Sequence, residues 1–228
     1  MIDELYYQAV DLLKSLIATP RLSRNESGGA DIVERFFSEH ACAPRRVANN
    51  VIVVDDDYDA GRPTLLLNSH IDTVKPVDGW TMDPFNPVVD ETETLFGLGS
   101  NDAGASLVSL IAAFLYMRRR RRDYNLIFVA SAEEEVSGKN GFELAARELP
   151  PVDVAIVGEP TGMNPAVAEK GLMVLDGVVD GVSGHAARNE GVNAIYNALP
   201  VVDTLRGLAF ERESAMLGPV KNSVTQIK

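Results

Sequence analysis

The stretch TLLLNSHIDTV, residues 64–74, joins an apolar run to a histidine and an aspartate that are separated by one residue. A continuous apolar run is typical of a strand in a parallel sheet that is covered on both faces. In open α/β sheets, ligands bind beyond the carboxyl ends of the strands, where loops bring distant side chains together. The position of His70 and Asp72 directly after this strand therefore indicates a functional site at the edge of such a sheet.

Helical and strand patterns alternate along the first two thirds of the chain, which favours an α/β fold with a mostly parallel sheet flanked by helices. Strands are expected at residues 50–55, 64–69, 125–131 and 152–158, and helices at residues 3–18, 29–40, 105–117 and 141–148. From about residue 170 the pattern changes, and residues 171–184, 193–208 and 222–228 predict the opening β-α-β of a smaller α+β domain. The sequence stops inside the last expected strand, so we expect a C-terminal truncation.

The composition excludes several functional classes. The 228 residues include 33 acidic and 21 basic residues, and the net charge of −12 argues against nucleic-acid binding and favours a cation as ligand. Cys42 is the single cysteine, which excludes an internal disulfide and a cysteine-based zinc cluster. We expect a cytoplasmic protein that does not bind membranes, because the N-terminus lacks a secretory pattern and no apolar run is long enough to span a bilayer. The five arginines at residues 118–122 predict a solvated helix end.

Acidic residues follow the other expected strands in the same way. Glu133, Glu134 and Glu135 come after residues 125–131, Glu159 comes after residues 152–158, and Asp102 lies in LFGLGSNDAGAS, residues 95–106, before a helix. Taken singly, these residues could be a hydrogen-bonded turn, a solvated helix start or a helix N-cap. Taken together, carboxylates crowded at one sheet edge repel one another unless a cation lies among them. We therefore expect a divalent metal site.

The types of donor narrow the choice of metal. One imidazole with several carboxylates and no thiolate suits zinc, with cobalt or manganese as alternatives. In this interpretation His70 is a metal ligand mounted on the strand, and Asp72 accepts the other ring proton of His70 and so fixes its tautomer.

Five motifs carry a resemblance to a known family. They are NSHIDTV, WTMDPFNP leading to LFGLGSNDAG, SAEEEVSG, VGEPTG and GVSGHAAR. With these motifs in the family's order and spacing, the chain resembles the co-catalytic zinc aminoacylases and exopeptidases, which include acetylornithine deacetylase, succinyl-diaminopimelate desuccinylase, aminoacylase and carboxypeptidase G. The resemblance implies a catalytic metal-binding domain at residues 1–168 and a partial lid and dimerisation domain at residues 169–228.

The resemblance also implies roles for individual residues. Asp102 would bridge two zinc ions, His70 and Glu159 would complete the ligands of one ion, and Glu135 would serve the other. Glu134 would be the general base. His185 would lie on the lid domain and reach into the partner subunit's site of a homodimer.

Two departures from the family pattern affect the site. Leu98 and Gly104 stand where family members commonly have an arginine and a lysine. The family's second metal also takes a histidine from a C-terminal stretch that this sequence lacks, and His40 and His185 are poorly placed to substitute for it. The chain is therefore expected to bind one zinc ion better than two.

Several functions remain open at this point. The first is a metal-dependent amidohydrolase that removes an N-acyl group from an amino acid, with N-acetyl- or N-succinyl-ornithine in arginine biosynthesis as first choice. Acylated diaminopimelate or a small dipeptide is the alternative substrate for the same chemistry. An alternative of another class is a non-catalytic fragment that binds metal or pairs with a partner. A nucleotide-binding domain is disfavoured, because its fingerprint requires glycine where Asp102 stands.

Overall fold

A five-stranded sheet forms the centre of the first of two units into which the chain divides. The computed structural model describes residues 2–188 and 190–228. The first unit ends at Met163 and the second begins at Asn164. The boundary implied by the resemblance, between residues 168 and 169, stays a prediction.

The strand order of the sheet is β1-β2-β6-β3-β7. The strands are β1 Arg45–Val47, β2 Asn50–Val54, β6 Asn125–Ser131, β3 Thr64–His70 and β7 Val154–Val157. β3 pairs in parallel with both β6 and β7, whereas β2 is antiparallel to β1 and to β6. The α/β prediction is confirmed, and the sheet is mixed because β2 alone runs in the opposite direction.

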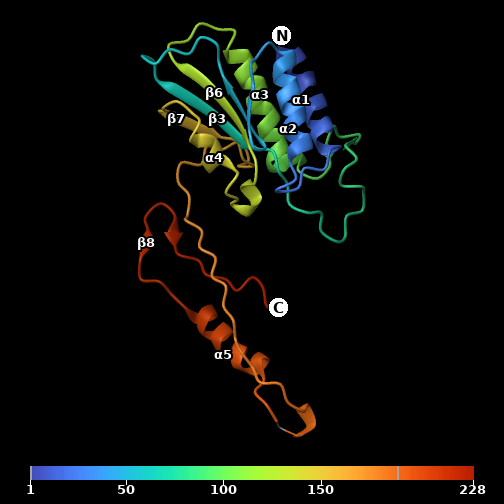
Figure 1. The fold of residues 1–228 in the computed structure, drawn as a ribbon, viewed down its shortest axis with the longest axis vertical. Coiled ribbons are helices and arrows are strands. Elements are labelled where there is room, and N and C mark those ends of the chain that lie inside the picture. The colour runs from blue at the N-terminus through green and yellow to red at the C-terminus, as the bar shows by residue number, and fades with distance from the viewer. Residues whose placement is uncertain (1, 189) are drawn as a thin grey trace. The chain divides into compact units, whose positions relative to one another are not determined.

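Helices cover both faces of this sheet. They are α1 Ile2–Ile17, α2 Ser27–Glu39, α3 Ser106–Met117 and α4 Phe142–Ala146. Figure 1 shows α1, α2 and α3 together on one side of the sheet, and the buried core of that side joins residues of these helices to alternate residues of β2 and β6. The other side carries a smaller core in which α4 contributes Ala145.

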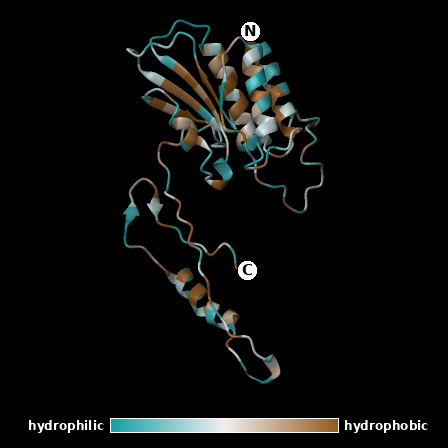
Figure 2. Ribbon diagram, viewed as in Figure 1, coloured by the Kyte–Doolittle hydropathy of each residue, from teal (hydrophilic) through white to brown (hydrophobic). Residues whose placement is uncertain are grey.

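Three aromatic rings lie at the centre of the larger core. Phe37 of α2, Phe114 of α3 and Phe128 of β6 are each 0% exposed. The ring of Phe37 lies 5.7 Å from that of Phe114 and 5.1 Å from that of Phe128, measured between centroids. Figure 2 shows the hydrophobic character of the strands and of α3 in this region. Burial of these rings ties the helical layer to the sheet.

The arginine run at the end of α3 is only partly solvated, which corrects the sequence interpretation. The side chains of Arg118 and Arg122 are 16% and 3% exposed. Arg118 Nε lies 3.0 Å from Asp55 Oδ1, and Arg122 also contacts the Asp55 carboxylate. Asp55 follows β2, so these ion pairs fasten the C-terminal end of α3 to the sheet. The sequence interpretation failed because the acidic partners lie more than 60 residues earlier.

Short elements surround the carboxyl ends of the parallel strands. The segment between β3 and α3 contains the hairpin of β4 Val88–Val89 and β5 Leu95–Phe96, followed by η1 Ser100–Ala105. A 3₁₀ turn, η2 Glu134–Val136, follows β6. None of the helices within residues 2–188 and 190–228 is long and apolar enough to cross a membrane.

The second unit contains different elements from those that its sequence pattern predicts. It comprises η3 Ala186–Arg188, α5 Ala194–Gly207, β8 Glu213–Ser214 and β9 Gly218–Pro219. The predicted helix is present, and Asn193 Oδ1 caps it by accepting a hydrogen bond from Ile195 N at 2.9 Å. The predicted strands at residues 171–184 and 222–228 are not strands, apart from an isolated bridge between Val182 and Val192. A strand needs a hydrogen-bonded neighbour, and the alternating pattern supplies none by itself.

Candidate metal centre

The predicted site residues meet at one edge of the sheet. His70 is the last residue of β3, Glu134 and Glu135 follow β6, and Glu159 follows β7. Because β3, β6 and β7 are parallel, their carboxyl ends share this edge. Asp102 reaches the same edge from η1, which immediately precedes α3.

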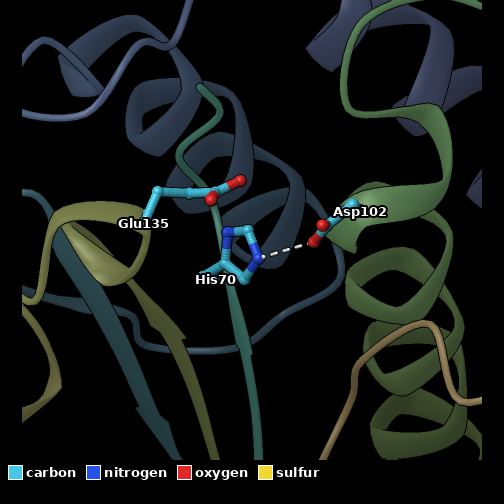
Figure 3. Close-up of side chains that lie close together, drawn as sticks. All are labelled: His70, Asp102 and Glu135. Atoms are coloured by element: carbon cyan, nitrogen blue, oxygen red, sulfur yellow. Dashed lines mark hydrogen bonds and ion pairs between the residues drawn. The ribbon is translucent and has the colours of Figure 1, made fainter. Parts of the chain in front are cut away.

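His70 is the centre of this arrangement. Its side chain is 1% exposed, and its Nδ1 lies 2.9 Å from the backbone oxygen of Asp72. A proton on Nδ1 donated to this carbonyl leaves the lone pair of Nε2 facing the carboxylates. Nε2 lies 3.1 Å from Asp102 Oδ1, 3.8 Å from Glu159 Oε2 and 4.0 Å from Glu134 Oε2. Figure 3 shows His70 directed at Asp102, with the Glu135 carboxylate close by.

The donor atoms have the spacing that a metal ion requires. One ligand atom each from His70, Asp102 and Glu135 lies within 4.8 Å of the other two. Around one zinc ion, with bonds of about 2.0–2.2 Å, ligand atoms lie roughly 3–4 Å apart. The distances from His70 Nε2 to Asp102 and Glu159 fall in this range. The residues present therefore fit a divalent ion in both donor type and spacing.

Asp72 is held differently from the expectation. The nearer partner of His70 Nδ1 is the backbone carbonyl of Asp72, and the Asp72 carboxylate lies 3.6 Å away. Instead, Asp72 Oδ1 accepts a hydrogen bond from Glu134 N at 3.0 Å and Oδ2 accepts one from Glu135 N at 3.2 Å. Ser23 Oγ also donates to Oδ2, at 2.7 Å. The buried Asp72 carboxylate thus secures the backbone that carries Glu134 and Glu135.

The electrostatics of the site show an excess of negative charge. Burial raises the pKa of Glu135, and the charge of Asp102 raises it further. Burial also raises the pKa of Glu159, and the neighbouring carboxylates add to this rise. Burial alone would lower the pKa of His70, but its interactions with Asp72 and Glu159 raise it to about 9. A bound cation would relieve this crowding.

Comparison with known proteins places the chain in a family. Residues 66–221, more than half of the chain, match the model of peptidase family M20/M25/M40. The chain belongs to this family. It is 30% identical over 219 residues to an acetylornithine deacetylase of Edwardsiella ictaluri, covering 89% of this chain and 57% of that protein. It is 26% identical over 236 residues to a succinyl-diaminopimelate desuccinylase of Nitratiruptor, covering 97% and 63%.

Solved structures agree with this assignment at the level of the fold. A tripeptidase of Staphylococcus aureus has a TM-score of 0.57 at 20% identity, over 86% of this chain and 56% of that one. The M20-family resemblance predicted from the motifs is confirmed. The chain spans less than two thirds of the length of the two curated relatives named above.

The other two histidines of this M20-family chain make local contacts of their own. His40 follows α2, where its Nδ1 lies 2.7 Å from the backbone oxygen of Phe36. His185 lies in the second unit and is exposed, and its Nδ1 accepts a hydrogen bond from Ala187 N at 3.2 Å. The role predicted for His185 stays a prediction.

Gly104, which stands where M20-family members commonly have a lysine, is closely packed. A Cβ atom at this position would lie 2.3 Å from the backbone oxygen of Gly99 and 2.6 Å from Leu13 Cδ1. The backbone of the Asp102 segment therefore leaves no room for a side chain here. Glycine in place of lysine at this position therefore agrees with the local packing.

Two buried charged residues at the centre were not foreseen from the sequence. Arg21 is 1% exposed and donates hydrogen bonds to backbone carbonyls of three separate segments. Burial lowers its pKa to about 10, although the charge of Asp72 acts in the opposite direction. Glu26 is 0% exposed, and its Oε1 accepts a hydrogen bond from Glu133 N at 3.3 Å. No motif marks either residue, because their partners near the site, Ile71, Gly99 and Glu133, lie 50 or more residues away in the chain.

Proposed function

We propose that this chain belongs to a metal-dependent amidohydrolase that removes an N-acyl group from a small acylated amino acid. N-acetyl- and N-succinyl-ornithine, in arginine biosynthesis, are the first candidate substrates. The proposal rests on the meeting of His70, Asp102, Glu135 and Glu159 beside Glu134. The names of the relatives, acetylornithine deacetylase and succinyl-diaminopimelate desuccinylase, support a substrate of this class.

The donor set suits Zn²⁺, with Co²⁺ as a substitute. His70, Asp102 and Glu159 would hold one ion, and Asp102 and Glu135 would contribute to a second. When bound, such ions supply Lewis acidity that polarises an amide carbonyl and makes a nearby water more acidic.

Glu134 is the proposed general base. Its side chain is 53% exposed while its Oε2 lies 4.0 Å from His70 Nε2, so it faces both the donor set and incoming substrate. Its carboxylate takes a proton from water as the water oxygen bonds to the acyl carbon. When the carbon–nitrogen bond breaks, that proton passes to the amine nitrogen. The products are an amine and a carboxylic acid, and Glu134 is again ionised.

His185 is proposed to donate a hydrogen bond to the developing oxyanion in the partner subunit of a homodimer formed through residues 169–228. Because Nδ1 accepts the amide proton of Ala187, the neutral ring carries its own proton on Nε2. Mixing two inactive variants, Glu134→Gln and His185→Ala, tests this role. A mixed dimer would contain one intact site, so we expect activity to return on mixing. No return of activity from two folded, dimeric variants would contradict the role of His185.

The decisive experiment for the function is a substrate panel assayed with added Zn²⁺ or Co²⁺. The panel contains N-acetyl-ornithine, N-succinyl-ornithine, N-succinyl-diaminopimelate and small dipeptides. We expect turnover of an ornithine derivative by the wild-type chain and loss of at least about 10²-fold in the Glu134→Gln variant. Turnover of the third substrate or of the dipeptides alone would shift the substrate assignment.

A second candidate function is a non-catalytic chain that binds metal or pairs with a partner. It is favoured by the incomplete second donor set: in the assignment proposed above, only Asp102 and Glu135 of the described residues at the site would contribute to a second ion. Tight binding of one zinc ion without turnover of any substrate on the panel would support this function over the hydrolase.

A further inference from the structure

A buried arginine behind the metal centre joins the segments that carry two of the ligands. Arg21 Nε lies 3.2 Å from the oxygen of Leu16 at the end of α1. Nη2 lies 3.0 Å from the oxygen of Gly99, three residues before Asp102. Nη1 donates to the oxygen of Ile71, the residue after His70. One planar guanidinium therefore connects α1, the end of β3 and the segment that precedes α3.

The backbone of Arg21 reinforces these side-chain contacts. Thr73 N donates to the backbone oxygen of Arg21 at 3.0 Å, and Ser23 N donates to the oxygen of Thr73 at 3.1 Å. Leu22 forms a parallel bridge with Thr73. The segment around Arg21 thus pairs with the residues that directly follow His70.

The packing around Arg21 leaves little freedom for the guanidinium. A Cβ atom at Gly99 would lie 2.7 Å from Arg21 Nη2, and Gly99 has a φ of +70°. A Cβ atom at Gly29 of α2 would lie 3.3 Å from both Cβ and Cδ of Arg21. Glycine at these two positions therefore lets α2 and the Asp102 segment approach the arginine closely.

From these contacts we propose that Arg21 is a positioning residue that fixes His70 and Asp102 at metal-binding separation before an ion arrives. The inference rests on the proposed metal site. A lysine could not do the same work, because its single ammonium group cannot span three carbonyls in three segments. Arg21 acts through the backbone of the ligand segments and contacts neither the ion nor the substrate.

The charge of Arg21 has the opposite effect on metal binding, which makes the inference testable. A cation next to the site repels a divalent ion, so loss of the charge alone would tighten metal binding. Loss of the positioning contacts would weaken binding, because the donors would no longer be held together. The direction of the change therefore distinguishes the two effects.

The experiment compares Arg21→Met and Arg21→Lys with wild type. Arg118→Met is the matched control, since Arg118 is also largely buried and donates to the backbone oxygens of His40 and Ala41. It follows the 12-residue helix α3, about 18 Å from the Asp102 end of that helix. Zn²⁺ affinity is measured by competition with a chromophoric chelator, and the Co²⁺ absorption spectrum reports ligand geometry. Hydrogen exchange of the metal-free chain reports the order of residues 70–73 and 99–104.

We expect both Arg21 variants to bind Zn²⁺ at least about tenfold more weakly than wild type, with an altered Co²⁺ spectrum. We also expect about tenfold faster exchange in residues 70–73 and 99–104. The control variant should show neither change.

Other outcomes would overturn the inference or the proposed function. Unchanged or tighter Zn²⁺ binding by Arg21→Met, or full recovery of affinity by Arg21→Lys, would overturn the inference. Unchanged exchange in the ligand segments would overturn it as well. If the wild-type chain binds no metal, the proposed function fails, and the exchange measurement alone decides whether Arg21 orders these segments.

Discussion

Replacing Asp72 with asparagine tests how Glu134 and Glu135 are held at the site. The Asp72 carboxylate uses one oxygen for Glu134 N and the other for Glu135 N. In Asp72→Asn one oxygen becomes an amide group, which leaves one of these partly buried N–H groups facing a donor. An unsatisfied buried donor costs about 1–3 kcal/mol, and loss of the charge weakens the remaining bond by about 1 kcal/mol. We therefore expect a loss of about 2–4 kcal/mol in the free energy of unfolding.

Removal of a negative charge from a crowded site would by itself stabilise the chain, but the pKa of Asp72 argues against this outcome. Burial alone would raise that pKa, yet the nearby His70 ring and hydrogen bonds from Ser23 and the Glu134 amide lower it below its usual value. A lowered pKa means that folding favours the charged form, so its removal is unfavourable. This contribution to stability is present above the unfolded pKa and is lost as the pH falls through the folded pKa.

The assay is urea unfolding of the metal-free chain near pH 7, followed by circular dichroism. Asp90→Asn is the matched control, because Asp90 Oδ1 alone accepts the amides of Thr92 and Thr94 in an exposed turn and would remain as an acceptor. We expect the control to lower the unfolding midpoint much less than Asp72→Asn does, because Asp90 is exposed to solvent. An Asp72→Asn midpoint equal to that of wild type would refute the assignment of Asp72 as the anchor of this backbone.

Three further outcomes are expected. After dialysis, metal analysis should find one tightly bound zinc ion per chain, and two such ions would show that a second site is complete. Phe37→Ala should lose about 3–5 kcal/mol in the free energy of unfolding, because the ring is fully buried between Phe114 and Phe128. The neighbouring Phe36→Ala should lose less, and equal losses would contradict the core assignment. Burial raises the pKa of the Cys42 thiol despite the nearby Arg118, so less thiolate is present in the folded chain. A disulfide reagent at pH 8 should therefore react more slowly with folded than with urea-unfolded protein. Equal rates would contradict this expectation.

Most helices and strands of the first unit could be predicted from the sequence, because burial determines the patterns of α1 to α3 and of β2, β3 and β6. The apolar run of β6 was predicted at residues 125–131 and forms the strand Asn125–Ser131. Every residue of that strand is buried, so its sequence needed no alternation to mark it. The same reasoning brought His70 and the later carboxylates to one edge, because parallel strands end together.

Other features could not be predicted because they depend on partners far along the chain. In the sequence Arg21 is one basic residue in a turn, and only folding brings the carbonyls of Ile71 and Gly99 to it. The pairing of Arg118 with Asp55 was missed for the same reason. In the second unit, residues 171–184 have an alternating pattern but form no ladder. A period of two indicates which residues share a face and does not supply the neighbouring strand.

Buried charged side chains around the candidate metal centre hydrogen-bond to different groups of the backbone. Glu26 and Asp72 accept hydrogen bonds from the amides of residues 133–135, whereas Arg21 donates to carbonyls on both sides of the site. The segments that carry the proposed ligands are thus held by side chains that lie behind them. It follows that chemistry and stability are separable by mutation. Glu134→Gln should abolish turnover at an unchanged unfolding midpoint, because the Glu134 side chain is 53% exposed, whereas Asp72→Asn should reduce both. Equal destabilisation by the two substitutions would show that the Glu134 side chain itself holds the site together.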